Sequence, residues 1–114
     1  MRISVVIPAH NESGNIGPLV EETYAAVPAE LLGEVIVVDD ASVDGTRAEI
    51  AALVGRYRTL HYLRHAEKSG QSTAMRTGIL AARHPVIATM DGDGQNDPRD
   101  IQKLYAALAP GAGG

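Results

Sequence analysis

Two acidic residues, Asp91 and Asp93, follow the apolar run Val86 to Met90 directly, in the stretch VIATMDGDGQNDP. The run predicts a β-strand buried on both faces, and carboxylates two positions apart on extended backbone point to the same side. Gly92 and Gly94 allow the backbone to approach a bulky ligand. Because neighbouring carboxylates repel each other unless a cation lies between them, the stretch predicts a site for Mg²⁺ or Mn²⁺. Both ions prefer oxygen ligands and are usually shared with substrate phosphates.

Acidic residues also follow two other predicted strands. Ile3 to Ile7 and Val35 to Val38 are short, β-branched, apolar runs typical of buried strands. Glu12 comes after the first run, and Asp39 and Asp40 come directly after the second. Ligands of parallel sheets bind outside the carboxyl ends of the strands, near the point where strand order reverses. With Asp91 and Asp93, five carboxylates are therefore expected on one rim of the sheet.

The segments between these runs have the spacing of amphipathic helices. A weaker strand is expected from Leu60 to Leu63, and Asp44 and Asp97 are expected to cap the helices that follow them. Gly78 lies inside a predicted helix at a cost of about 1 kcal/mol relative to Ala, so close packing on the sheet is its expected reason. About four βα units predict an α/β fold: a doubly wound, Rossmann-like, mainly parallel sheet forming a single domain over residues 1–114.

The basic residues and histidines give a weaker signal. Lys68 and Arg76 lie on either side of a predicted helix start near the same rim, where each could meet a phosphate or belong to a solvated basic face. His10 lies in a polar loop and is interpreted as a solvated turn residue. The other histidines show no metal-ligand spacing: His61, His65 and His84.

Composition excludes several classes of function. Ten basic and fourteen acidic residues give a net charge of −4, which offers no electrostatic footprint for nucleic acid. Without Trp or Phe there is no obvious platform for stacking bases. The absence of cysteine excludes a disulfide scaffold and a cysteine nucleophile. No stretch resembles a signal peptide or a transmembrane helix, so a cytoplasmic location is expected.

Other phosphate-binding and metal-binding motifs fit less well. Neither a GxGxxG nor a GxxxxGK[ST] loop is present, and a calcium loop starting at Asp91 would need Gly at position 96 and Glu at position 102, which are Asn96 and Gln102. A receiver-like phospho-acceptor module is the alternative from another class. In receivers the acidic pair follows the first strand and a Lys follows the last. Here the acidic pair follows the second strand, and Lys68 precedes the fourth.

Four segments together resemble the nucleotide-binding half of a family 2 glycosyltransferase of the GT-A fold. The most similar group is the polyprenyl-phosphate, or dolichol-phosphate mannose synthase-like, sugar transferases. The segments occur in family order with family spacing, and from the first to the last they extend over most of the chain. They are VVIPAHNE at 5–12, VIVVDDASVDGT at 35–46, KSGQSTAMRTGI at 68–79 and MDGDGQNDP at 90–98.

The resemblance implies binding of a nucleotide-diphosphate sugar and inverting sugar transfer, to a polyprenyl phosphate such as dolichyl or undecaprenyl phosphate. Pro8 and Glu12 resemble residues that line the nucleobase and ribose pocket. Asp39 and Asp40 resemble an acidic pair of which one residue accepts from the base and the other supports the loop. The Asp-x-Asp pair at 91–93 resembles the motif that holds Mg²⁺ or Mn²⁺ against the donor diphosphate.

Members of the family continue past the last matching segment. This chain is therefore expected to be the N-terminal part of such an enzyme, with catalytic residues beyond Gly114 and no transfer activity of its own. A lipid-phosphate acceptor would place the full-length protein at the cytoplasmic face of a membrane. The predicted strand from Val86 to Met90 would keep an unpaired edge, which favours self-association of the 114-residue chain.

Overall fold

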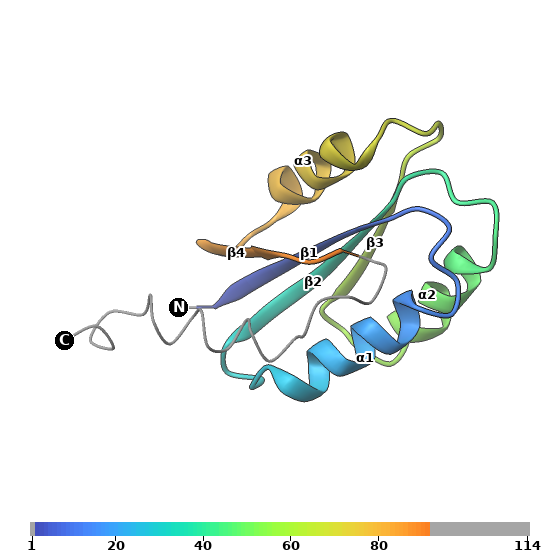
Figure 1. Cartoon of the computed structure of the whole chain (residues 1–114). Helices are drawn as coiled ribbons and strands as arrows, with labels where there is room; N and C mark the ends of the chain where they lie inside the picture. The colour runs from blue at the N-terminus through green and yellow to red at the C-terminus, as the bar shows by residue number, and fades with distance from the viewer. Residues whose placement is uncertain (1, 92–114) are drawn as a thin grey trace.

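Strands and helices alternate along the part of the chain that the structure describes, residues 2–91 of a computed structural model. This order confirms the predicted α/β fold (Figure 1). None of the helices in this part is both long and apolar enough to cross a membrane. The elements are β1 (Ile3–Ala9), α1 (Ile16–Ala26), β2 (Leu32–Asp39), α2 (Thr46–Val54), β3 (Leu60–Arg64), α3 (Gln71–Ala81) and β4 (Val86–Thr89).

All four strands are parallel, in the order β3-β2-β1-β4. The chain moves from β1 through β2 to β3 and then returns to place β4 on the other side of β1. Because parallel crossovers are right-handed, this reversal puts α1 and α2 on one face of the sheet and α3 on the other (Figure 1). The order switches between β1 and β4, so the carboxyl ends of these strands are where a ligand is expected.

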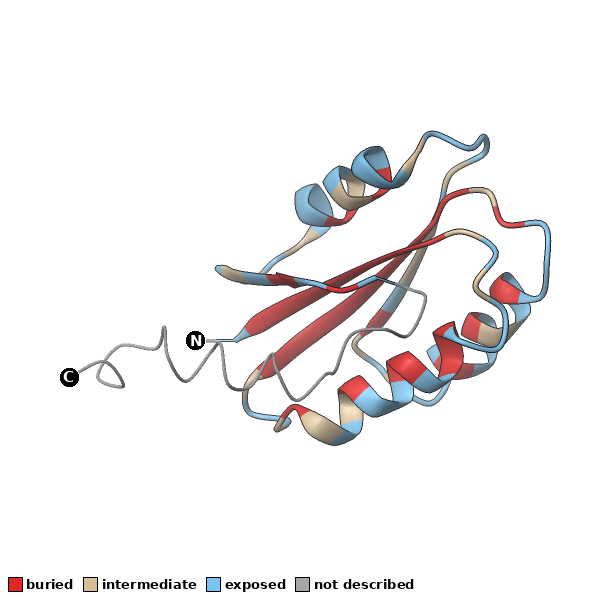
Figure 2. Cartoon of the chain, in the orientation of Figure 1, coloured by how far each residue is buried: buried red, intermediate tan, exposed pale blue. Residues whose placement is uncertain are grey.

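The two central strands, β1 and β2, are buried along their whole length (Figure 2). The larger core lies between the sheet and the helices α1 and α2, where Ile16, Val20 and Ile50 are fully buried. A smaller cluster on the other face joins β2 to α3 through Ile36, Val38 and Ala74. The asymmetry follows from the side chains of α3, which buries only small residues.

The predicted burial of the run Val86 to Met90 on both faces is wrong. Ile87 is 38% exposed and Val86 is half-buried, whereas Ala88 and Met90 face the larger core. Within residues 2–91, β4 is an edge strand that pairs only with β1. Its second face is open because α3 packs mainly against β1 and β2. Self-association through this edge stays a prediction, and the predicted last helix lies outside the described residues.

Strand β1 continues through Pro8, where the sequence predicted its end. Pro8 lies opposite Val38 of β2. The N–H of Met90 donates to the carbonyl of Val6, so the backbone of Val6 faces β4, and by alternation that of Pro8 faces the same side. β4 ends at Thr89, so the missing N–H of Pro8 breaks no hydrogen bond of the described sheet.

A buried carboxylate fixes the opposite end of the sheet. Glu34 accepts hydrogen bonds from the hydroxyl of Ser4 at 2.6 Å and from the N–H of Arg83 at 2.7 Å, and His61 lies 3.4 Å away. Burial alone would raise the pKa of Glu34, but these hydrogen bonds and the nearby histidines outweigh it and lower the pKa. The contact with Arg83 fastens the α3–β4 connection and so sets where β4 begins.

Gly78 permits the close approach of α3 to the sheet, as the sequence predicted. A Cβ atom at this position would lie 2.3 Å from Cγ1 of Val6 and 3.2 Å from Cγ2 of Val38. Both neighbours are short, fully buried β-branched side chains that have little room to move. The contact therefore sets the distance between α3 and the sheet.

We expect Gly78→Ala to lower the free energy of unfolding by about 1–3 kcal/mol through overpacking, although Ala is the better helix former by about 1 kcal/mol. Gly55→Ala is the matched control, because nothing lies within 4 Å of its added Cβ and its φ of −71° suits Ala. Urea unfolding of both variants measures the effect. Equal midpoints for Gly78→Ala and the wild type would contradict it.

Candidate functional site

An open cavity of about 370 Å³ lies at the carboxyl ends of β1, β2 and β4, beside the start of α3. This is the rim where the strand order switches, as predicted for a ligand site. The wall combines carboxylates, one lysine and small apolar side chains. It is lined by Pro8, Ala9, His10, Glu12, Asp40, Lys68, Gln71, Ala74 and Asp91.

Five of the eight residues predicted for the site line this cavity: Pro8, Glu12, Asp40, Lys68 and Asp91. Two others do not line it. Asp39 is fully buried below the loop that follows β2, and Arg76 is exposed on α3. The eighth, Asp93, lies outside the described residues.

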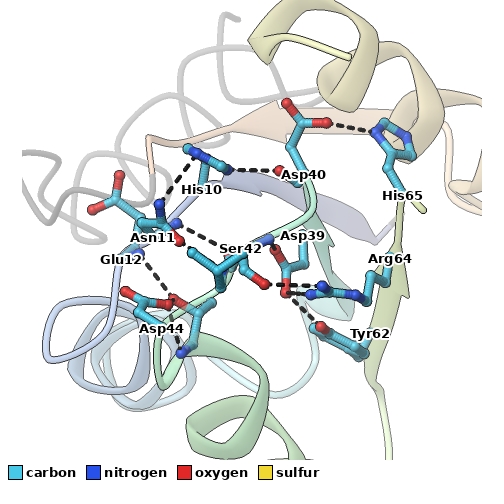
Figure 3. Close-up of polar contacts among 12 residues, drawn as sticks. His10, Asn11, Glu12, Asp39, Asp40, Ser42, Asp44, Tyr62, Arg64 and His65 are labelled. Atoms are coloured by element: carbon cyan, nitrogen blue, oxygen red, sulfur yellow. Dashed lines mark hydrogen bonds and ion pairs between the residues drawn. The ribbon is translucent and has the colours of Figure 1, made fainter. Parts of the chain in front are cut away.

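Asp39 anchors the loop after β2 from beneath (Figure 3). Its carboxylate accepts hydrogen bonds from the N–H of Ser42 at 2.9 Å, from the hydroxyl of Tyr62 and from Nη1 of Arg64 at 2.9 Å. Nη2 of Arg64 donates in turn to the carbonyl of Ser42 at 2.9 Å. Burial alone would raise the pKa of Asp39, but the hydrogen bonds from Ser42 and Tyr62 and the charge of Arg64 lower it below its ordinary value.

Asp40 points to the other side of the strand end and faces the cavity. Its carboxylate accepts from the N–H groups of Ser69 and Gly70, each at 2.8 Å, and lies 2.9 Å from Nδ1 of His65. Burial would raise the pKa of Asp40, but the contacts with Ser69, His65 and Gly70 outweigh it, so the pKa is lowered. Asp40 is thus an ionised group that joins β2 to the segment leading into α3.

The loops after β1 and β2 hold each other in a strained shape. Asn11 and Ala41 have φ values of 52° and 59°, a left-handed conformation that non-glycine residues rarely adopt. The N–H of Asn11 donates to the hydroxyl oxygen of Ser42 at 2.8 Å, and its side-chain oxygen accepts from the N–H of Val43 at 2.9 Å. Such strain persists where surrounding contacts over-determine it, which is common at binding sites.

The same two loops fix the backbone of Glu12. Its N–H donates to the hydroxyl oxygen of Thr46, the first residue of α2, at 2.9 Å. Thr46 is held by Asp44, whose carboxylate accepts from both the N–H and the hydroxyl of Thr46. The sequence predicted Asp44 as the N-cap residue of α2, but that residue is Gly45, which makes no side-chain capping hydrogen bond. Asp44, one position earlier, instead accepts from the first N–H of the helix.

Three residues at or beside the site were not predicted from the sequence. His10 lines the cavity, and its Nδ1 donates to the carbonyl of Asp40 at 2.6 Å, so its interpretation as a solvated turn residue is wrong. Gln71 donates from Nε2 to Oδ1 of Asp91 at 2.7 Å, and His65 contacts Asp40. Their positions could have identified them in the sequence, since each lies just beyond a strand end or at a helix start on the same rim.

The charged groups that line the cavity are mostly acidic. Glu12, Asp40 and Asp91 line it together with Lys68, the one basic side chain in the described lining apart from His10. This excess of carboxylates would repel a diphosphate unless a divalent ion neutralised it. The oxygen donors of Asp91 suit Mg²⁺ or Mn²⁺. Residues 2–91 contain no group of three His, Cys, Asp or Glu side chains that could together hold a metal ion.

Sequence comparison relates the chain to sugar transferases. The family profile described as Glycosyl transferase family 2 matches residues 4–113. Dodecaprenyl-phosphate galacturonate synthase of Rhizobium johnstonii is 43% identical over 110 residues, which cover 95% of this chain and 32% of the relative. Dolichol-phosphate mannosyltransferase of Saccharomyces cerevisiae is 33% identical over 107 residues, 92% of this chain and 40% of the relative. The chain thus spans roughly a third of these relatives.

Solved structures show the same fold. The mannosyltransferase PcManGT from Pyrobaculum calidifontis, in complex with GDP-Man and Mn²⁺, superposes with a TM-score of 0.74 and 28% identity over 81% of this chain and 27% of its own. S. aureus TarS 1-349 superposes with a TM-score of 0.80 over 96% of this chain and 33% of its own. At 21% identity, the likeness to TarS concerns the fold alone.

We expect Asp39→Asn to lower the free energy of unfolding at pH 7 by about 2–3 kcal/mol, because the amide leaves Arg64 without its carboxylate. Asp39 has a lowered pKa in the folded chain, so its contribution is complete above the ordinary value of 3.8 and is lost as pH falls through the folded pKa. The difference between wild type and variant should therefore shrink below about pH 4 in urea unfolding.

Glu21→Gln is the control for this prediction. Glu21 pairs with Arg56 on the surface, where the side chains are 48% and 63% exposed, and such pairs contribute about 0–1 kcal/mol. A difference between Asp39→Asn and wild type that stayed constant from pH 7 to pH 3 would contradict the assigned role of the Asp39 charge.

Proposed function

This chain belongs to glycosyl transferase family 2, and on that basis we propose that it forms the N-terminal, nucleotide-sugar-binding part of a glycosyltransferase. The observation that carries the proposal is the meeting of Asp40, Asp91 and Lys68, from three separate segments, around one cavity at the switch point of the sheet. The family membership replaces the receiver-like alternative.

The lining of the cavity offers groups for both parts of a nucleotide-diphosphate sugar. Pro8, Glu12 and Asp40 provide an apolar ring and two carboxylates, which would accept hydrogen bonds from ribose hydroxyls and base N–H groups. Asp91 would hold Mg²⁺ or Mn²⁺ together with Asp93, and Lys68 would contact a phosphate. The solved relative bound to GDP-Man and Mn²⁺ supports this assignment.

The divalent ion would neutralise the charge that develops on the departing nucleoside diphosphate. The residues of this chain would hold the donor in place. Gln71 orients Asp91 through its 2.7 Å hydrogen bond, and the joined loops after β1 and β2 would fix the nucleoside of the donor. A donor held in this way exposes the anomeric carbon of its sugar to an acceptor placed in line behind it, as inversion requires.

We further propose a polyprenyl phosphate as the acceptor of the full-length enzyme. Both curated relatives described above carry a polyprenyl or dolichol phosphate in their names. A phosphate acceptor is already anionic at neutral pH, so its attack needs no general base from residues 2–91. Its lipid would keep the enzyme at the cytoplasmic face of a membrane, with the remaining catalytic residues beyond Gly114.

Isothermal titration of GDP and UDP, with Mn²⁺ and with EDTA, tests the donor site. We expect weak binding that requires the metal and is lost in Asp91→Asn. Asp40→Asn should weaken nucleotide binding by about ten- to a hundredfold, the value of one hydrogen bond to a charged group, and should leave Mn²⁺-pyrophosphate binding unchanged. Nucleotide binding that ignores EDTA and both substitutions would refute the proposed site.

Lys68 and Arg76 provide a matched pair of basic residues. Both are exposed, and Lys68 precedes the start of α3 whereas Arg76 follows it. Only Lys68 lines the cavity. We expect Lys68→Gln to weaken Mn²⁺-pyrophosphate binding several-fold and Arg76→Gln to leave it unchanged. An equal loss in the two variants would mean that the net positive charge, and not a phosphate contact, matters at this rim.

A further inference from the structure

His65 lies directly after β3 and contacts two different elements through its two ring nitrogens. Nδ1 is 2.9 Å from Oδ1 of Asp40, and Nε2 is 2.9 Å from Oγ1 of Thr77 on α3. The side chain is 16% exposed and does not line the cavity. Figure 3 shows the ring beside the carboxylate of Asp40, on the side away from Glu12.

Nδ1 of His65 carries a proton and donates a hydrogen bond to Asp40, because an ionised carboxylate can only accept a hydrogen bond. The hydroxyl of Thr77 donates to the carbonyl of Thr73 at 3.0 Å, which leaves its oxygen free to accept from His65. On turning away from Thr73, the same hydroxyl could instead donate to a bare Nε2. The bond from His65 to Asp40 therefore persists whether or not Nε2 carries a proton.

The contact completes a three-point hold on the carboxylate of Asp40. Oδ1 accepts from His65 and from the N–H of Ser69, and Oδ2 accepts from the N–H of Gly70. Without His65, only the two backbone donors would remain. Because both lie on one short segment, the carboxylate could rotate about them. With His65, donors from the end of β3 and from the segment before α3 fix the plane of the carboxylate.

We propose that His65 is a positioning residue, which presents the Asp40 carboxylate to the nucleoside end of the donor and couples it to α3 through Thr77. The inference rests on the proposed donor site. It assigns His65 no contact with the ligand: a preorganised carboxylate binds more tightly because less orientational freedom is lost on binding. Movement of α3, which carries Gln71 against Asp91, is thereby linked to the orientation of Asp40.

Three variants separate this role from simple packing. His65→Gln keeps an amide N–H that can donate to Asp40, whereas His65→Leu fills similar space without a donor. Thr77→Val removes the acceptor at Nε2 and keeps the β-branched shape of the side chain. If His65 only fills space, His65→Leu should have the smaller effect. If His65 positions Asp40, His65→Gln should have the smaller effect.

The first measurement is amide hydrogen exchange by NMR on the whole 114-residue chain without ligand. We expect His65→Leu to speed exchange at Ser69 and Gly70 about tenfold or more, with Thr77→Val intermediate and His65→Gln close to wild type. The amides of Val37 and Val38 in the central strand report global stability and should not change. Unaltered protection of Ser69 and Gly70 in His65→Leu would overturn the positioning role.

The second measurement is titration of GDP, UDP and pyrophosphate in the presence of Mn²⁺. His65→Leu should lose about five- to twentyfold in nucleotide affinity, His65→Gln should recover most of it, and pyrophosphate binding should not change. Wild-type affinity in His65→Leu would refute the link to the donor. If the wild type itself bound neither nucleotide, the proposed function would fail, and the exchange experiment would still decide the role of His65.

Discussion

The structure depends on the alternation of side chains at the end of β2. Consecutive residues of an extended strand point to opposite sides, so the neighbours Asp39 and Asp40 serve different partners. Asp39 reaches the side chains at the end of β3, and Asp40 reaches the segment that leads into α3. Both carboxylates are almost completely buried, and each is stable because several donors surround it. Together they connect β2, β3 and α3 around the cavity.

The reversal of strand order explains why the cavity lies where it does. The loops after β1 and β2 lead to helices on one face of the sheet, and α3 lies on the other face (Figure 1). The cavity lies at the strand ends and is lined by residues of β1, of the loops after β1 and β2, and of α3. Gly78 allows α3 to lie close to the sheet, which brings Gln71 and Ala74 to the cavity wall. The cavity is thus a result of topology, and its polarity is a result of the residues placed at the strand ends.

In the proposed function, the carboxylates of the cavity have two different roles. Buried, hydrogen-bonded carboxylates stay ionised and fixed, which suits recognition of neutral N–H and hydroxyl groups. An exposed carboxylate such as Asp91 can instead change partners when a metal binds. The same residue type can therefore serve recognition at one end of a donor and metal binding at the other. The chain covers 32% and 40% of the two relatives described above.

The sequence alone determined the order and type of the elements from β1 to β4, the rim that carries the site and the reason for Gly78, because apolar periodicity and turn residues are local signals. Tertiary structure decided three things: the exposure of β4, which of Asp39 and Asp40 holds the loop and which faces the cavity, and the recruitment of His10, His65 and Gln71. Each of these depends on which strands become neighbours and on which face a helix packs. Such long-range contacts join residues 20 to 80 positions apart, and they leave no periodic pattern in the sequence.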